Sequence, residues 1–215
     1  MKNYSYLICL AIFIAFSQTI HAQISLGLKS GYTNAWEDYQ DDMLPEDAEI
    51  DIHSFNVYFI TVYEINPFLD LNAEIGFIQR GAACVPGWQP IFEGDTKFYL
   101  SYIDLPIFIQ GNLPLFNNRV ELFGKLGYGL SYMVYAQNAM TEFGSDEPAE
   151  RKKMDFSIFN RLDHGVHAAG GIAYNLARHQ IFLESAYYRG MRDAEINNVS
   201  KNNNINFNLG YRFKL

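Results

Sequence analysis

Only a few side chains in this sequence have types and spacings that could do chemistry. His164 and His167 lie three residues apart, and Glu184 and Ser185 are adjacent. A metal needs several ligands on one side, and nucleophilic catalysis needs a hydroxyl beside a base. On β-strands, side chains alternate between faces, so the two histidines would point in opposite directions, and so would Glu184 and Ser185. The spacing therefore argues against a shared metal and against a Ser185–His167–Glu184 catalytic set.

The densest group of charges is acidic and lies between Ala35 and Asp51. It has eight carboxylates and no lysine or arginine: Glu37, Asp38, Asp41, Asp42, Glu46, Asp47, Glu49 and Asp51. Carboxylates suit calcium, but the spacing does not follow the EF-hand loop, and no glycine stands at its turn position. We interpret residues 35–51 as a solvated external loop.

Three closely spaced glycines, Gly124, Gly127 and Gly129, do not form a phosphate-binding loop. A dinucleotide motif needs a helix after it, whereas the residues around these glycines alternate as a strand does. Glycine inside a strand instead permits coiling or close packing. Cys84 is the only cysteine outside the amino-terminal segment, and a lone thiol can neither form an intrachain disulfide nor hold a metal by itself. We expect no catalytic, cofactor-binding or metal-binding residues.

The carboxyl-terminal segment Ile205–Leu215 alternates strictly between apolar and polar side chains. Period-two alternation predicts a strand with one apolar and one polar face. Seven further segments alternate in the same way: near 24–33, 53–64, 68–80, 98–111, 119–137, 163–176 and 180–192. Each reaches the length of about 9–11 residues that a tilted strand needs to cross a bilayer. Pro106, inside the fourth segment, lacks an amide hydrogen and predicts a gap in the ladder or a bulge.

The connections between these segments alternate in length. Three are short, at 65–67, 112–118 and 177–179, and four are long, at 35–52, 81–97, 138–162 and 193–203. Outer-membrane barrels have short periplasmic turns and long external loops. The sequence therefore predicts an all-β fold, an eight-stranded antiparallel up-and-down transmembrane β-barrel, with both ends of the barrel domain on the periplasmic side.

The amino terminus reads as an export signal. Lys2 precedes an apolar core from Tyr6 to Phe16, and Ala22–Gln23 is a plausible cleavage junction. We expect residues 1–22 to be a cleaved signal peptide and 23–215 to form the barrel domain in the cell outer membrane. The net charge of −8 argues against a nucleic-acid partner.

Alternation does not itself reveal which face points inward, because a soluble lipocalin-like barrel alternates with its apolar face inside. The glycine, serine and asparagine on the polar face favour a narrow lumen, and aromatic residues gather toward the strand ends as in interfacial girdles. Under this interpretation seven charged residues share the interior: Lys29, Glu74, Asp104, Glu121, Lys125, Glu184 and Arg212. Buried charges must pair, so we expect a plugged barrel without a wide pore.

Several segments resemble a known family. Tyr102–Phe108 has the pattern tyrosine, aliphatic, acid, aliphatic, proline, aliphatic, and it resembles mid-barrel strands of the Bacteroidetes outer-membrane β-barrel family, which includes the PorT-like proteins. Gly124–Gly129, Asp163–Gly171 and Leu209–Phe213 are similar to it as well. The resemblance implies a structural or interaction role, with outer-membrane lipid and other envelope or secretion proteins as partners, and no catalytic residues to transfer. The alternatives are an outer-membrane lipid-modifying enzyme and a soluble ligand-binding barrel.

Overall fold

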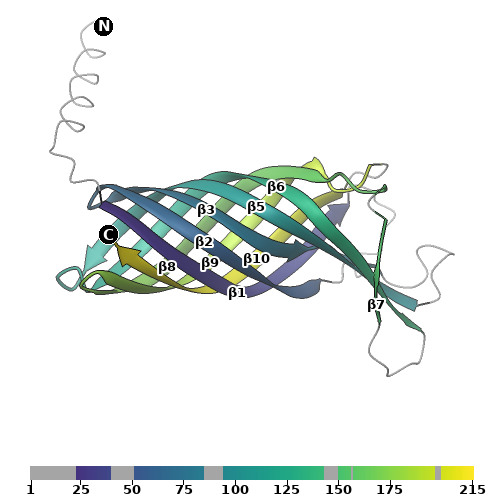
Figure 1. Ribbon diagram of the computed structural model, residues 1–215, viewed down its shortest axis with the longest axis horizontal. Helices are drawn as coiled ribbons and strands as arrows, with labels where there is room; N and C mark the ends of the chain where they lie inside the picture. Colours follow the sequence, from purple (N-terminus) through teal and green to yellow (C-terminus); the bar gives the residue numbers. More distant parts are fainter. Residues whose placement is uncertain (1–22, 40–50, 85–93, 143–149, 156, 197–199) are drawn as a thin grey trace, which may run out of the picture.

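The fold was obtained as a computed structural model, which describes residues 23–39, 51–84, 94–142, 150–155, 157–196 and 200–215 (Figure 1). The predicted signal peptide, 1–22, lies outside the described residues. Ten strands are present: β1 (Gln23–Tyr39), β2 (Ile52–Asn66), β3 (Leu69–Arg80), β4 (Ala83–Cys84), β5 (Gly94–Leu115), β6 (Val120–Glu142), β7 (Arg151–Lys153), β8 (Leu162–Leu176), β9 (His179–Asp193) and β10 (Ser200–Lys214). No helix among the described residues is long and apolar enough to span a membrane.

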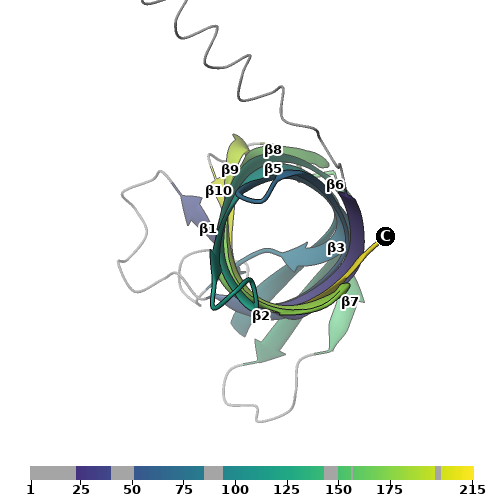
Figure 2. The same ribbon diagram turned by 90° about the vertical axis from the view of Figure 1, so that its left-hand side faces the viewer.

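The eight long strands form a closed antiparallel barrel. Each pairs with its neighbour in the chain, and β10 returns to pair with β1 from Ser25↔Lys214 to Tyr39↔Ser200. Viewed from the end that carries the short turns, the strands make a complete ring (Figure 2). Closure pairs the backbone groups of both end strands, which a sheet in hydrocarbon requires. The predicted eight-stranded fold is confirmed, and Gln23 and Leu215 lie at the same end of the barrel (Figure 1).

All eight predicted strands are present, but the sequence underestimated several of them on the side of the long loops. β1 continues to Tyr39, so Glu37 and Asp38 belong to a strand and not to the predicted loop, and Glu37 is buried. The rest of the acidic segment, except Asp51, lies outside the described residues. β10 likewise begins at Ser200 instead of Ile205. Pairing of a strand with its neighbours continues beyond the bilayer wherever a partner is available, and apolar alternation does not mark where such pairing ends.

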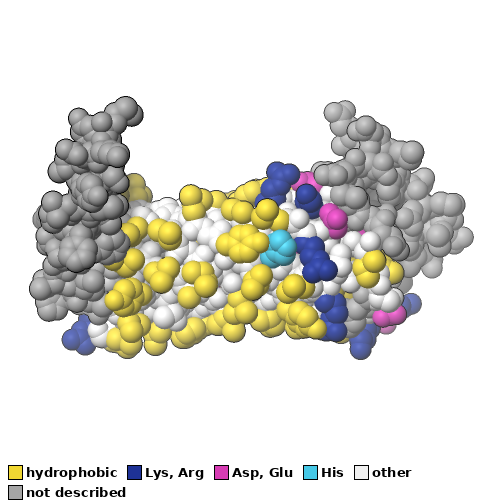
Figure 3. All heavy atoms as spheres, turned by 90° about the horizontal axis from the view of Figure 1, so that it is seen from above, with side chains coloured by type: hydrophobic (Ala, Val, Ile, Leu, Met, Phe, Trp, Pro, Cys, Tyr) yellow, Lys and Arg dark blue, Asp and Glu magenta, His cyan; other side chains and the backbone are white. Residues whose placement is uncertain are grey.

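Apolar side chains cover the outside of the barrel. Leu126, Ile109 and Leu209 are 67%, 64% and 60% exposed. On the face seen in Figure 3, hydrophobic side chains form a broad band between the two ends of the barrel. A soluble barrel with its apolar face inside is therefore excluded, because the apolar face points outward.

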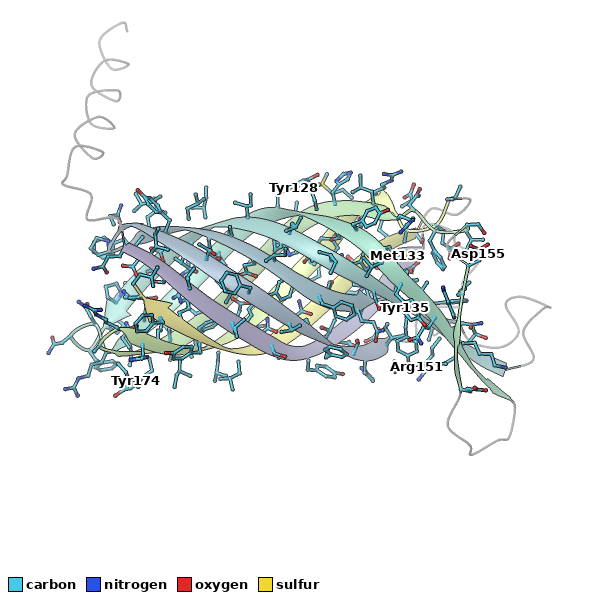
Figure 4. The ribbon with its side chains drawn as sticks, viewed as in Figure 1. Tyr128, Met133, Tyr135, Arg151, Asp155 and Tyr174 are labelled. Carbon is cyan, nitrogen blue, oxygen red and sulfur yellow. The ribbon has the colours of Figure 1, made fainter. Side chains whose placement is uncertain are left out.

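Aromatic side chains border this band, as the sequence predicts. Tyr128 and Tyr174 lie on the outer surface towards opposite ends of the barrel (Figure 4). Three tyrosine hydroxyls bond to histidine Nδ1 atoms on the outer surface: Tyr32 to His53 at 2.5 Å, Tyr128 to His164 at 2.6 Å and Tyr211 to His179 at 2.5 Å. An amphipathic ring with a polar tip suits the boundary between hydrocarbon and water. Tyr99, an aromatic residue near the start of β5, differs from this expectation, because it is 8% exposed and packs in a buried cluster.

Pro106 interrupts the ladder between β3 and β5. Their register passes from Ala73↔Ile107 to Gly76↔Asp104 without a shift, so the pairs between these positions are missing and no bulge is present there. This confirms the gap expected from a residue without an amide hydrogen. Gly127 of β6 is opposite Phe108 of β5. It lets the Phe108 ring pack closely against β6, because a Cβ at this position would collide with the ring.

A four-stranded extension stands on the long-loop end of the barrel. β5 pairs with β3 only up to Leu100, and its residues 94–99 continue beside β4. β6 likewise continues past β8 and pairs with β7 at residues 137–139. Six residues of strand reach about 20 Å, and the extension is visible beyond the ring of strands in Figure 1. Neither β4 nor β7 was foreseen, since segments of two and three residues are too short for a periodicity.

Candidate functional site

The centre of the lumen contains a closed ring of four charges. Lys29 from β1 and Lys125 from β6 each contact Glu74 from β3 and Glu184 from β9. The four Nζ–Oε distances are 2.7, 2.6, 2.6 and 2.6 Å, and no side chain of the four is more than 3% exposed. We call these residues the Lys–Glu ring. Because two positive charges face two negative ones, the ring is neutral, which removes most of the cost of burying it.

Neighbouring residues complete the polar contacts of the ring. Asn208 donates to Glu184 Oε1 at 3.1 Å. The Lys29 ammonium lies 5.0 Å from the centre of the Tyr58 ring, and that of Lys125 lies 4.6 Å from the centre of the Phe108 ring. Both distances fall within the range of cation–π attraction. The ring is therefore held by four strands that are not adjacent in sequence.

A second polar cluster lies toward the long-loop end and is centred on Arg80. Its guanidinium approaches Asp104 at 3.4 Å and Asp163 at 3.7 Å, and it also donates to Ser131 Oγ at 2.8 Å and Asn204 Oδ1 at 2.9 Å. We call these residues the Arg80 cluster. Arg80 is 0% exposed, so its charge depends wholly on these partners.

Aromatic rings enclose the Arg80 cluster. The guanidinium carbon lies 3.8 Å from the centre of the Tyr188 ring and 5.2 Å from that of Tyr102. The Tyr58 hydroxyl donates to Asp104 at 2.7 Å. His167 packs against Tyr188 with ring centres 4.6 Å apart. These rings occupy the cross-section of the lumen at this level.

Apolar layers lie on both sides of the charged centre. Toward the short turns, five buried side chains pack together: Ile60, Val62, Phe123, Ala173 and Phe182. Toward the long loops, a second buried cluster contains Ile78, Leu100, Met133 and Phe159 together with Tyr58 and Tyr102. Polar contacts are also present at the short-turn end of the lumen, where Arg212 bonds to Gln180 and approaches Glu121 at 3.6 Å. The described interior is therefore filled along its length, as the sequence predicts for eight strands.

All seven charged residues assigned to the interior from the sequence point inward, and opposite charges pair as predicted. Sequence reasoning missed Arg80 and Asp163, which carry the second cluster. Both positions carried a usable signal. Arg80 continues the lumen-facing alternation of Glu74 and Gly76, and Asp163 that of Gly165 and His167.

The hydroxyl, imidazole and carboxylate considered for catalysis do not come together. Ser185 is exposed on the outer face, whereas Glu184 and His167 are buried in the lumen. His167 on β8 is opposite Tyr188 on β9, and Tyr188 is four residues from Glu184 along β9. His164 lies on the outer face beside Tyr128, opposite in direction to His167. Among the described residues, no three histidine, cysteine or acidic side chains are grouped to hold a metal.

This packing predicts that the protein does not conduct ions freely. Purified protein in a planar bilayer should give no large, stable conductance, because the Arg80 cluster and its rings fill the lumen. The double variant Tyr102→Ala/Tyr188→Ala should produce small, resolvable current steps, since it removes the two rings flanking Arg80. A large, stable conductance from the unaltered protein would contradict the plugged lumen.

Comparison with known proteins agrees with this geometry. Residues 16–195 match the family model described as outer membrane protein beta-barrel domain. A search of curated proteins finds no significant match. Among solved structures, the outer membrane protein OprG from Pseudomonas aeruginosa is similar at 12% identity and a TM-score of 0.50, covering 91% of this chain and 97% of that one. Neisserial surface protein A is similar at 13% identity and a TM-score of 0.45, covering 88% and 97%. The attachment invasion locus protein Ail of Yersinia pestis is similar at 15% identity and a TM-score of 0.44, covering 89% and 99%.

Proposed function

This chain belongs to the outer membrane protein beta-barrel domain family, and from that premise we propose that it is a closed, non-catalytic barrel that presents a β-sheet extension to another envelope protein. The barrel anchors the extension in the outer membrane. The observation that carries the proposal is the open sheet edge at β7, which stands above the barrel wall.

The edge has the properties of a protein-binding strand. Among the described strands, β7 pairs only with β6, so its other edge offers unpaired backbone groups. Such an edge can accept an extended segment of another chain as an added strand. All three residues of β7 are exposed, and the Arg151 guanidinium lies 4.0 Å from the centre of the Tyr99 ring, which steadies the strand against β5 (Figure 4).

The charge of β7 restricts its partner. Arg151, Lys152 and Lys153 carry three adjacent positive charges. These charges repel a second copy of the same strand and disfavour pairing with an uncharged strand. Natural sheets protect their edges with charged side chains in this way. An acidic extended segment would have complementary charge.

The PorT-like resemblance directs the search for this partner. Tyr102, Asp104 and Pro106, which belong to the segment that carries the resemblance, lie in β5, the strand that continues into the extension. We therefore propose components of a protein-secretion apparatus as the first partners to examine. A lipid-modifying activity is the competing function, and the separation of Ser185 from His167 and Glu184 counts against it.

Site-specific photo-crosslinking in intact cells tests the proposal. A photoreactive residue at Lys152 should yield one adduct of defined mass with an envelope protein. The matched control is Leu126, which is 67% exposed in the lipid-facing band and should give no such adduct. Identical adduct patterns at both positions, or none at Lys152 in a correctly folded barrel, would contradict a role for the extension.

A further inference from the structure

One carboxylate inside the barrel lacks the counter-charge that its neighbours have. Asp70, on β3 at the short-turn end, is 3% exposed. In the part of the chain that the structure describes, no basic group lies within 4 Å of its carboxylate. Five other carboxylates that face the lumen each have such a partner: Glu74, Asp104, Glu121, Asp163 and Glu184. Because a buried carboxylate without a counter-charge is costly, Asp70 needs either a proton or a cation from outside the chain.

Two buried oxygen atoms at this place have no hydrogen-bond partner among the described residues. Asp70 Oδ2 accepts from Asn112 Nδ2 at 2.8 Å and from Gln110 Nε2 at 3.3 Å, whereas Asp70 Oδ1 is one of the two oxygens without a partner. The other is Oδ1 of Asn72, which is the next residue of β3 that faces the lumen and is 2% exposed. Buried polar atoms are nearly always paired, so two unpaired acceptors on one face of a strand indicate a missing donor or cation.

Gln110 holds the side chains of Asp70 and Asn72 close together. It is opposite Asp70 in the β3–β5 ladder, and its amide group both donates to Asp70 Oδ2 and accepts from Asn72 Nδ2 at 3.4 Å. The two residues start about 7 Å apart along β3, since side chains on one face of a strand are two residues apart. Both side chains end at the same amide group, which brings their unpaired oxygens to one polar site.

The charges around this site favour a cation. Glu64 is opposite Asp70, is half-buried, and forms an ion pair with Lys214 at 2.7 Å. Glu121 is likewise half-buried and lies 3.6 Å from Arg212. Of the described charged side chains that face the lumen at this end, Asp70 is therefore the surplus negative charge. A negative site beside half-buried carboxylates attracts cations from the surrounding water.

We propose that Asp70 and Asn72 bind a divalent cation at the short-turn end of the lumen, calcium in preference to magnesium. Carboxylate and amide oxygens suit hard cations, and calcium accepts an irregular arrangement of ligands, whereas magnesium demands a near-ideal octahedron. Two protein oxygens leave the remaining positions to water. The affinity should therefore be that of weak extracellular calcium sites, with a Kd of about 10⁻⁴–10⁻³ M. This site differs from the expectation of no metal-binding residue, because two oxygens on one strand have no ligand spacing that a sequence would reveal.

Nuclear magnetic resonance of the isotope-labelled full barrel in a neutral detergent can test the site directly. Calcium chloride is added at neutral pH and physiological salt, and magnesium chloride is the competing probe. The backbone amide signals of Asp70 and Asn72 should shift and saturate with the Kd given above, and magnesium should need a concentration at least about threefold higher. The variant Asp70→Asn keeps the size of the side chain but removes its charge. It should weaken calcium binding at least about tenfold, because calcium affinity depends on the number of charged ligands.

The matched control makes the same substitution away from the lumen. Asp155 is exposed at the long-loop end (Figure 4), so Asp155→Asn should bind calcium at the site as the unaltered barrel does. Heat-modifiable migration in electrophoresis verifies that both variants are folded. Three results would overturn the proposal: no response of the Asp70 and Asn72 signals to calcium, an equal response of the Asn72 signal in the Asp70→Asn variant, or a side-chain carboxyl signal showing that Asp70 stays protonated when calcium is added.

Discussion

Removing Ile205–Leu215 should abolish insertion of the barrel into the outer membrane. These residues supply most of β10, which closes the sheet between β1 and β9. Without them, both neighbours would present unpaired backbone groups to hydrocarbon, at several kcal/mol for each group. The total exceeds the roughly 5–15 kcal/mol by which a native protein is stable. The measurement is heat-resistant, protease-protected migration of the protein recovered from outer-membrane fractions.

Two full-length variants separate strand closure from mere chain length. Phe207→Leu/Leu209→Ile keeps the apolar face of β10 and should insert normally. Phe207→Asn/Asn208→Phe keeps the composition but exchanges one residue of the outer face with one of the inner face, placing an amide in lipid and a ring where Asn208 bonds Glu184. This variant should fail as the truncation does. A truncated chain that still migrates as a folded barrel would refute the role assigned to β10.

The variant Glu184→Ala should destabilise the folded barrel by about 3–5 kcal/mol, the usual cost of breaking a buried ion pair. Glu184 contacts both lysines of the Lys–Glu ring at 2.6 Å. Its loss leaves two buried ammonium groups to share Glu74. Reversible unfolding in urea with lipid vesicles measures the change in free energy, followed by tryptophan fluorescence or electrophoretic mobility.

A charge-balanced double variant is the control for this effect. Lys29→Met/Glu184→Gln removes one charge of each sign and leaves the Lys125–Glu74 pair intact at 2.6 Å. Neutral replacement of a buried pair is often close to neutral in stability, so this variant should recover most of the loss. If the double variant is as unstable as Glu184→Ala, charge balance within the Lys–Glu ring does not determine the stability.

The lumen of this protein serves its stability, and its outer surface is left for contacts with other molecules. The charged groups of the Lys–Glu ring pair within the ring, and those of the Arg80 cluster pair within the cluster. The apolar layers on both sides separate these groups from bulk water. Contacts with other molecules then fall to the outside of the barrel. The exposed edge of β7 is such a surface, and it lies at the long-loop end.

By itself the sequence determined the medium, the strand number and the facing of most residues. Period-two alternation from Ile24 to Leu215 assigns each side chain to one of two faces, and this assignment depends only on local geometry. Alternating short and long connections then determine which end each strand starts from. Because burying a charge requires a counter-charge, the sequence also predicted that Lys29, Glu74 and Glu184 would pair inside.

Only the tertiary structure decided which charges meet. Lys29 and Glu184 are separated by 155 residues, and their contact depends on the stagger between strands when the sheet closes. The same holds for Arg80, which reaches Asp163 across the lumen from a strand that is not its neighbour. The extension also needed the structure, since β4 and β7 form only because β5 and β6 continue beyond their barrel partners. Alternation describes a single strand, whereas the lumen and the extension arise from how strands are placed against one another.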